Sequence, residues 1–181
     1  MERDLFTEEH EDFRKMVRDF LEKEIVPQYD EWHDMVPREV FTRLGELGIM
    51  GVRLPEEFGG GGAEGFLWNA IIGEEAARAL VSLGPLRCHM DIVSPYFTRF
   101  ANDEQRKRWL PGLASGELFS AIAMTEPNTG SDLAGIRTTA RRDGDSFIVN
   151  GSKTFITGAS HADLVVTVAR TSDEENRREG L

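Results

Sequence analysis

The chain has 181 residues, of which 40% are hydrophobic and 29% are charged. This composition is sufficient to bury a core, and it excludes a disordered, collagen-like or low-complexity chain. The 21 basic and 32 acidic residues give a net charge of −11. Nucleic acids and anionic membrane surfaces are bound mainly through Lys and Arg, so neither is expected as a partner.

The sequence also bears on the cellular compartment. No stretch approaches the roughly 20 consecutive apolar residues that a membrane-spanning helix requires. The N-terminus, Met1 to Asp4, has neither the basic flank of a signal peptide nor the composition of a transit peptide. The single cysteine, Cys88, cannot form an internal disulfide. We therefore expect a cytoplasmic protein.

Amphipathic helices are predicted along the first two-thirds of the chain. Thr7 followed by acidic residues is typical of a helix N-terminus, and Pro27 is expected to end that first helix. Pro37 suits a first helical position, and Gly48 suits the end of the second helix. The run from Gly59 to Gly62 predicts a loop. The expected helices lie at about residues 8–26, 37–47, 67–77, 92–100 and 103–115.

The apolar period changes from helical to strand-like after Gly116. Asp143-Gly144 and Asn150-Gly151 predict hairpin turns, because both dipeptides supply the positive φ angles of type I′ turns. The segments around them predict an antiparallel meander. Its strands are expected at about residues 119–125, 136–141, 147–149, 154–157 and 164–169.

The expected fold class is α+β. An N-terminal all-α helical bundle, residues 1–117, is followed by an antiparallel β-domain, residues 118–181. Five strands leave an open edge and a bare apolar face, so we expect the β-domain to be incomplete at its C-terminus. The charged run 172–179 is predicted to be a solvated loop. We expect the chain to be the N-terminal part of a longer protein.

The histidine, cysteine and glycine patterns give no independent site. The four histidines and the one cysteine lack the spacing of a metal cluster, so no metal is expected. The glycine run 59–62 links two predicted helices, whereas a dinucleotide fingerprint lies between a strand and a helix. Gly151-Ser152-Lys153-Thr154 departs from a nucleotide-binding P-loop through the extra Ser152.

The segment from Ala123 to Gly135 is more informative. It leaves an apolar strand and enters a loop that is dense in hydroxyl-bearing and small residues. A planar cofactor with a diphosphate tail needs such a surface, since small residues allow close approach while hydroxyls and amides donate hydrogen bonds. A turn between two strands would have a similar composition. The residue types alone leave both interpretations open.

Four motifs resemble the acyl-CoA dehydrogenase family. The signature TEPxxGSDxxG, from Thr125 to Gly135, resembles the family's first signature. Three further motifs occur in the family's order and spacing: LGIMGVxxPEEFGG at 47–60, QxxxWLPxLAxGE at 105–117 and NGxKxFIT at 150–157. The resemblance runs along almost the whole chain. Two positions depart from the usual pattern: Thr129 replaces a smaller residue, and Phe155 stands where many members have tryptophan.

The resemblance implies a fold and an activity. Family members have an N-terminal helical domain, a middle β-domain and a C-terminal four-helix domain, the last of which is expected to be absent here. They bind FAD and oxidise an acyl-CoA thioester to the trans-2-enoyl-CoA, and they pass the electrons to electron-transferring flavoprotein. A homotetramer is implied as well, in which a neighbouring subunit completes the FAD site.

The resemblance also implies which residues contact the cofactor. Thr125 and nearby main-chain groups are expected on the isoalloxazine, and Phe155 and Thr157 against the ring and its N5 edge. Ser131 is expected to bind substrate as well, near the pantetheine. The full set of expected cofactor-binding residues is Ile122, Ala123, Met124, Thr125, Gly130, Ser131, Phe155, Ile156 and Thr157. The implied catalytic base is a glutamate beyond Leu181, and the place of Glu126 in the family pattern is structural.

Two alternatives stay open. An acyl-CoA oxidase or a flavin monooxygenase-like relative would use the same fold and differ in how the reduced flavin meets oxygen. A non-catalytic interaction module would keep the helical scaffold and bind no flavin. In each flavoenzyme case, residues 1–181 alone are expected to be inactive and to bind FAD weakly.

Overall fold

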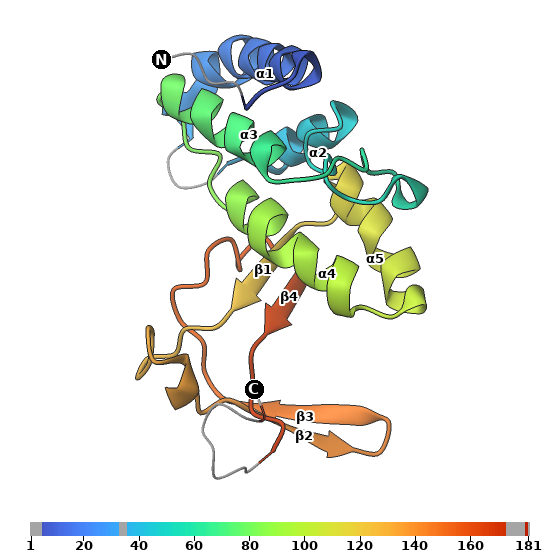
Figure 1. Ribbon diagram of the computed structural model, residues 1–181. Coiled ribbons are helices and arrows are strands. Elements are labelled where there is room, and N and C mark those ends of the chain that lie inside the picture. The colour runs from blue at the N-terminus through green and yellow to red at the C-terminus, as the bar shows by residue number, and fades with distance from the viewer. Residues whose placement is uncertain (1–4, 33–35, 173–179, 181) are drawn as a thin grey trace. The chain divides into compact units, whose positions relative to one another are not determined.

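The computed structural model describes residues 5–32, 36–172 and 180. The chain divides into two compact units, a helical unit that ends at Phe119 and a β-unit that begins at Ser120 (Figure 1). His33 and residues 173–179 of the charged run, which is predicted to be a solvated loop, lie outside the described residues.

Within the described residues, the helical unit contains the five expected α-helices. They are α1 (Glu8–Phe20), α2 (Arg38–Glu46), α3 (Leu67–Arg78), α4 (Ser94–Phe100) and α5 (Asp103–Ser115). The short helical segments are 3-10 at Val26–Glu31 and Glu56–Phe58, and π-helical at Leu21–Ile25 and Cys88–Val93. The first helix ends just before Pro27, as expected, because its α- and π-helical turns run only to Ile25. Pro27 lies in the first turn of a new 3-10 segment, where its missing N–H is not needed.

Local sequence signals set the ends of α5. Asn102 Oδ1 accepts a hydrogen bond from the Gln105 amide at 2.8 Å, and Gln105 Oε1 accepts one from the Asn102 amide at 3.0 Å. This reciprocal pair satisfies two backbone donors at the helix N-terminus. Gly116 follows the helix with a φ of 75°, a conformation that glycine adopts without strain. The sequence-based limits of this helix are confirmed.

The helical unit closes around an apolar core. Helix α1 packs against α3, and α5 packs against α2 and α4. Val17 on α1, Ile71 on α3 and Leu110 on α5 are each at most 1% exposed. Burying a side chain of this kind contributes about 1.5–3 kcal/mol. Among the helices of the described residues, none combines the length and apolar character needed to cross a bilayer.

A buried ion cluster joins α1 to α3. Glu75 is 1% exposed and accepts hydrogen bonds from Arg14 Nη1 at 3.0 Å and Arg18 Nε at 2.8 Å. Burial opposes ionisation of Glu75, but hydrogen bonds from Arg18 and Arg14 outweigh it and lower the pKa of this carboxyl. The buried charge is therefore compensated, which is the condition for tolerating it inside the unit.

The β-unit contains four short strands in its described part. They are β1 (Ser120–Ala123), β2 (Thr139–Asp143), β3 (Ser146–Asn150) and β4 (Leu164–Thr167) (Figure 1). Strands β2 and β3 pair antiparallel with Asp143 opposite Ser146, and Gly144 adopts a φ of 58° in the connection. The hairpin predicted from Asp143-Gly144 is confirmed.

The prediction of an antiparallel meander is wrong in two respects. Strand β1 pairs in parallel with β4, with Ser120 opposite Leu164, so the β-unit combines one parallel and one antiparallel pair. Residues 154–157 form no strand, and Asn150-Gly151 does not form a hairpin turn. Gly151 serves a close approach instead, because a Cβ atom there would lie 2.3 Å from Thr138 Oγ1.

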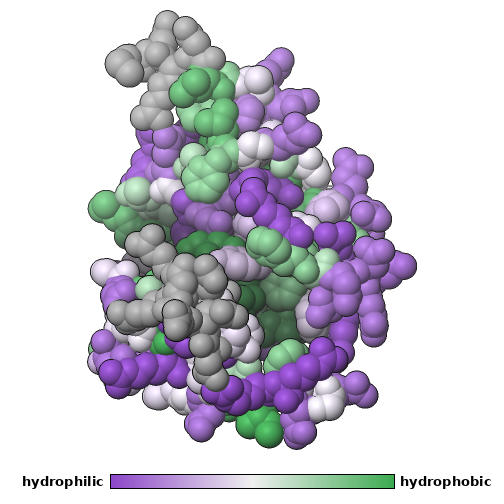
Figure 2. Space-filling view, turned by 60° about the horizontal axis from the view of Figure 1, so that its bottom comes forward, coloured by the Kyte–Doolittle hydropathy of each residue, from purple (hydrophilic) through white to green (hydrophobic). Residues whose placement is uncertain are grey.

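The β2–β3 hairpin leaves apolar side chains exposed. Phe147, Ile148 and Val149 are 58%, 60% and 57% exposed. Successive residues of a strand point to opposite faces, so both faces of the hairpin are apolar. Figure 2 shows apolar patches at the molecular surface, interrupted by hydrophilic side chains. The exposure agrees with the expectation of a bare apolar surface in the β-domain.

Candidate functional site

The Glu126 carboxylate organises the loop that follows β1. Glu126 is 4% exposed and accepts hydrogen bonds from the backbone amides of Arg137 at 2.7 Å and Thr138 at 2.8 Å. Thr138 Oγ1 donates a further bond at 2.5 Å, and Lys153 Nζ donates one at 3.0 Å. One side chain thus ties together three segments of the β-unit.

These contacts determine the charge state of Glu126. Burial opposes its ionisation, but hydrogen bonds from the Thr138 hydroxyl, the two backbone amides and Lys153 outweigh burial and lower the pKa of Glu126 to about 2. A carboxylate that accepts several hydrogen bonds is a weak base. The geometry therefore gives Glu126 a structural role.

Lys153 brings the segment after β1 next to the segment after β3. Its ammonium group donates to the Met124 carbonyl at 2.9 Å as well as to Glu126. The Thr154 amide then donates to the Thr125 carbonyl at 3.0 Å. Residues 124–125 consequently lie beside the start of the 154–157 segment, although more than 25 residues separate them in the sequence.

The signature loop between Glu126 and Ile136 contains one local turn and is also held by a contact from later in the chain. Glu126 and Thr129 exchange two backbone hydrogen bonds, at 2.9 and 3.1 Å, which close a tight turn. Further along, Arg170 Nε donates to the Ile136 carbonyl at 2.9 Å. Gly130 and Ser131, between these two fixed points, are exposed.

Gly130 is not required by the protein's own packing. A Cβ atom at this position would meet nothing within 4 Å, and the backbone φ is not in the left-handed region. A ligand that approaches the backbone closely is a physical reason for glycine at such a position.

Phe155 has an unusual conformation. It is 91% exposed, and its φ of 55° lies in the left-handed region, which costs an ordinary residue roughly 1–2 kcal/mol. The backbone on either side is fixed by the Thr154 amide bond to Thr125 and by the Ala159 amide bond to the Ile156 carbonyl at 3.2 Å. An exposed aromatic ring held in a strained conformation indicates a surface for a ligand.

The structure brings some of the predicted cofactor-binding residues together. Met124 and Thr125 are half-buried and lie beside the segment that carries Phe155, Ile156 and Thr157. Ile122 and Ala123, by contrast, are 7% and 4% exposed within β1, so their side chains belong mainly to the packing of the unit. The roles assigned to all nine residues stay predictions.

The sequence motifs missed the residues that fix the shape of the site. Thr138 and Arg170 belong to no motif, yet Thr138 binds Glu126 and the Arg170 guanidinium bonds to the carbonyl oxygens of Ala134, at 2.5 Å, and Ile136. Lys153, by contrast, belongs to the NGxKxFIT motif and is the only lysine of the sequence after Lys107. No sequence signal identifies Thr138, because its hydroxyl is one of many in this region.

Metal binding has no support among the residues that the structure describes. No group of three or more His, Cys, Asp or Glu side chains there could hold an ion. His89 is instead a packing residue, with its ring stacked on Phe119 at 5.3 Å and Nε2 3.2 Å from the Leu113 carbonyl. Burial lowers the pKa of His89 to about 4.

The donor set of the candidate site fits a flavin. An exposed aromatic ring offers a face for a planar heterocycle, and the hydroxyls of Thr125, Ser131 and Thr157 can donate to its carbonyl and phosphate oxygens. Gly130 leaves room for close approach. The Glu126 carboxylate, next to Thr125, is compensated by Lys153 at 3.0 Å, and Asp132, next to Ser131, is exposed. The arrangement can therefore bind and orient a large anionic cofactor.

Comparison with known proteins identifies the family. The family model for the acyl-CoA dehydrogenase N-terminal domain matches residues 7–117, and the one for the middle domain matches residues 121–181. The mitochondrial long-chain specific acyl-CoA dehydrogenase of Mus musculus is 41% identical over 174 residues, which make up 95% of this chain and 40% of that protein.

Solved structures agree with this result. An acyl-CoA dehydrogenase from Geobacillus kaustophilus matches with a TM-score of 0.93 and 42% identity, covering 99% of this chain and 48% of that one. An acyl-CoA dehydrogenase from Bacillus anthracis complexed with FAD matches with a TM-score of 0.82 and 35% identity, covering 94% and 31%. The chain therefore belongs to the acyl-CoA dehydrogenase family. It spans less than half the length of each of these relatives.

Proposed function

We propose that the chain supplies the N-terminal domain, residues 1–117, and the first part of the middle domain, residues 118–181, of an FAD-dependent acyl-CoA dehydrogenase. The reaction is the α,β-dehydrogenation of an acyl-CoA thioester to the trans-2-enoyl-CoA, with electrons passed to electron-transferring flavoprotein. The observation that carries the proposal is the pair of contacts from Lys153 to Glu126 and to the Met124 carbonyl, because it holds residues 124–125 beside the segment that carries the exposed Phe155. The relative from Bacillus anthracis that is complexed with FAD supports the choice of cofactor.

Each exposed group of the candidate site has a role in this proposal. When bound, FAD supplies the hydride-accepting chemistry, and the protein supplies position and electrostatics. Phe155 offers its face to the flavin ring, while Thr125 and Thr157 donate hydrogen bonds to the polar edge of the ring. Ser131 contacts the flavin and the pantetheine of the substrate. Gly130 lets the main chain approach both.

Proton abstraction requires a group other than Glu126. A pKa of about 2 and four hydrogen bonds make this carboxylate a poor base, and its burial keeps substrate away. In line with what the family resemblance implies, the proposal places the base outside residues 1–181.

The proposal includes a homotetramer and a cytoplasmic location. The apolar faces of the β2–β3 hairpin support association with further protein, since exposed apolar patches mark such contacts. The single Cys88 supports a reducing compartment.

A chimera tests the proposal. Residues 1–181 replace the matching segment of the Geobacillus kaustophilus relative, so that the remaining chain is supplied by a protein of known fold. The chimera is expected to purify with flavin absorbance and to reduce a dye acceptor with straight-chain acyl-CoA thioesters. A folded but colourless chimera would overturn the proposal, and fast reoxidation of its reduced flavin by air would indicate an oxidase instead.

Thr157→Val in the chimera tests the role of one residue. Losing a hydrogen bond to a buried acceptor costs about 1–3 kcal/mol, so flavin reduction should slow by up to roughly a hundredfold and the reduction potential should shift. Thr171→Val, an exposed threonine of the same unit outside the candidate site, is the matched control and should change neither quantity. Equal rates and potentials in both variants would remove Thr157 from the site.

A further inference from the structure

The hydroxyl group of Thr129 forms a hydrogen bond across the exposed part of the signature loop. Thr129 Oγ1 donates to the Asp132 carbonyl at 2.5 Å, and this bond spans Gly130 and Ser131. Thr129 is also one of the two positions at which the chain departs from the usual family pattern, in which a smaller residue stands there. A glycine or an alanine has no hydroxyl and could not form this bond.

Both ends of this hydrogen bond are held by further contacts. At one end, the backbone of Thr129 exchanges two hydrogen bonds with Glu126, which is 4% exposed. At the other end, the Asp132 carbonyl also accepts a hydrogen bond from the Gly135 amide at 2.8 Å. The two residues between Thr129 and Asp132 are therefore enclosed by a short ring that is attached to the rest of the loop on both sides.

A loop that contains a glycine gains most from such a restraint. Gly130 has nothing near the position of a Cβ atom, and a glycine has more backbone freedom than any other residue. Ordering a free loop on a ligand costs conformational entropy, which weakens binding. The Thr129 bond limits this freedom before a ligand arrives, so it preorganises the loop.

The same bond determines which polar groups the loop can offer to a ligand. A backbone carbonyl oxygen has two lone pairs, and the Asp132 carbonyl already accepts from Thr129 Oγ1 and from the Gly135 amide. This carbonyl therefore has no acceptor position left, whereas the exposed Ser131 hydroxyl can donate. Such a loop suits a ligand that presents oxygen acceptors, as flavin, phosphate and the amides of pantetheine do.

We propose that Thr129 is a positioning residue, which holds Gly130 and Ser131 in the conformation that receives the flavin and the acyl-CoA pantetheine. The inference rests on the proposed function, in which Ser131 contacts both groups. The hydroxyl proton of Thr129 is donated to Asp132, so Thr129 acts through Ser131 and not on the ligand itself.

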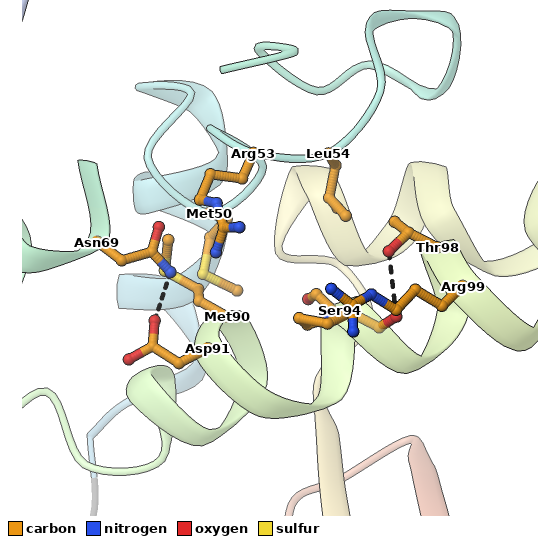
Figure 3. Close-up of a pocket in the computed structure, with 10 residues that line it drawn as sticks. Met50, Arg53, Leu54, Asn69, Met90, Asp91, Ser94, Thr98 and Arg99 are labelled. Carbon is orange, nitrogen blue, oxygen red and sulfur yellow. Dashed lines mark hydrogen bonds between the residues drawn. The ribbon is translucent and has the colours of Figure 1, made fainter. Parts of the chain in front are cut away.

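Thr98 provides a matched control for substitutions of Thr129. It lies in α4 and lines a cavity of about 320 Å³ within the helical unit (Figure 3). Thr98 Oγ1 donates to the Pro95 carbonyl at 3.1 Å, the bond drawn at Thr98 in Figure 3. Both threonines are half-buried, and each hydroxyl bonds to a carbonyl three residues away. Thr98→Val therefore removes the same kind of bond from a segment that helical hydrogen bonds already hold.

NMR relaxation of the 181-residue chain measures the restraint itself. The Gly130 and Ser131 amides should have the order parameters of a rigid backbone, about 0.85, in the wild type and should fall below about 0.6 in Thr129→Val. Thr129→Ser retains the hydroxyl and should keep both amides rigid, and Thr98→Val should leave them unchanged. Equal order parameters in the wild type and Thr129→Val would overturn the proposal.

The chimera measures whether the restraint matters for ligands. Thr129→Val should raise the Kd for FAD and the KM for acyl-CoA by about 3–10-fold, the effect of one hydrogen bond, while kcat and the thermal midpoint stay unchanged. Thr129→Ser should restore both constants. In a Ser131→Ala background, Thr129→Val should change the KM by less than about twofold, because residues that act through one another are not additive. A lower thermal midpoint with unchanged Kd and KM would show a purely structural role and refute the inference.

The chimera also separates this inference from the function on which it rests. A wild-type chimera that folds without flavin would refute the proposed function, and the inference with it. A yellow and active wild-type chimera whose Thr129→Val variant has the same Kd and KM would refute the inference alone.

Discussion

Replacing Glu126 with Gln tests whether one buried carboxylate holds the loops of the β-unit in place. The substitution keeps the size of the side chain but leaves one acceptor oxygen, so the new amide group faces a backbone N–H or the Lys153 ammonium. A pKa of about 2, below the ordinary value of 4.5, corresponds to about 3 kcal/mol in favour of the ionised form. Because Lys153 also loses its partner, we expect a loss of about 3–5 kcal/mol.

Hydrogen exchange resolved by peptide is the appropriate assay. Trp32, Trp68 and Trp109 all lie in the helical unit, so intrinsic tryptophan fluorescence does not report on the β-unit. Exchange across 120–172 should become about 100–5,000-fold faster in Glu126→Gln, whereas exchange across 36–115 should not change. Asp145→Asn, an exposed acid in the hairpin connection, is the control and should resemble the wild type.

The effect of this substitution depends on pH in a defined direction. The folded-state pKa of Glu126 is lowered, so its stabilisation is fully present above about pH 4.5 and is lost as the pH falls toward about 2. The protection of residues 120–172 against hydrogen exchange, corrected for intrinsic exchange rates, should therefore differ between wild type and Glu126→Gln by a constant amount from about pH 7 to pH 5. Below about pH 5 this difference in protection should shrink. Equal protection of 120–172 in both proteins at neutral pH would refute the structural role of Glu126.

Three further substitutions have defined outcomes. Glu75→Gln should lower the free energy of unfolding of the helical unit by about 3–5 kcal/mol, measured by tryptophan fluorescence in urea, because it removes the partner of Arg14 and Arg18. Glu64→Gln, at an exposed position, is the control. Equal urea midpoints for the Glu75 variant and the control would contradict the prediction. Leu110→Ala, at a fully buried position, should cost about 2–5 kcal/mol in the same assay, and a loss below about 1 kcal/mol would show that the site collapses around the smaller side chain. Phe155→Gly should stabilise the β-unit by about 0.5–1 kcal/mol, because it removes the strain at a φ of 55°. Both Phe155→Gly and Phe155→Ala should weaken flavin binding in the chimera, and retention of full binding would contradict the role of the ring.

The helices could be predicted because their signals are local. Asn102 and Gly116 mark the two ends of α5 within a single stretch of sequence, and apolar periodicity marks the buried face of each helix. The strand pairing could not be predicted in the same way. Strand β4 pairs with β1 across more than 40 residues, and nothing local specifies that its direction is parallel. Asn150-Gly151 misled the prediction because glycine marks close approaches as well as turns.

The same distinction applies to the candidate site, where some residues could be predicted from local sequence and others could not. Thr125, Gly130 and Ser131 lie within one contiguous signature, so a sequence motif can point to them. The contacts that shape the signature come from Thr138 and Lys153, which are neighbours of Glu126 only in the folded chain. A motif records which residues recur together along a sequence, whereas the hydrogen bonds of one carboxylate are set by tertiary structure.

The Glu126 contacts have a consequence for the order in which the chain acquires its structure. Glu126 bonds to Thr138, 12 positions later, and to Lys153, 27 positions later. Closing such loops costs entropy before any bond is formed, so the signature segment cannot keep its final shape while the later residues are missing. During synthesis from the N-terminus, residues 124–135 therefore emerge without their fixed form and gain it only after the β2–β3 hairpin and Lys153 have followed. Premature termination between Gly135 and Lys153 would yield a complete helical unit with an intact signature sequence and no site.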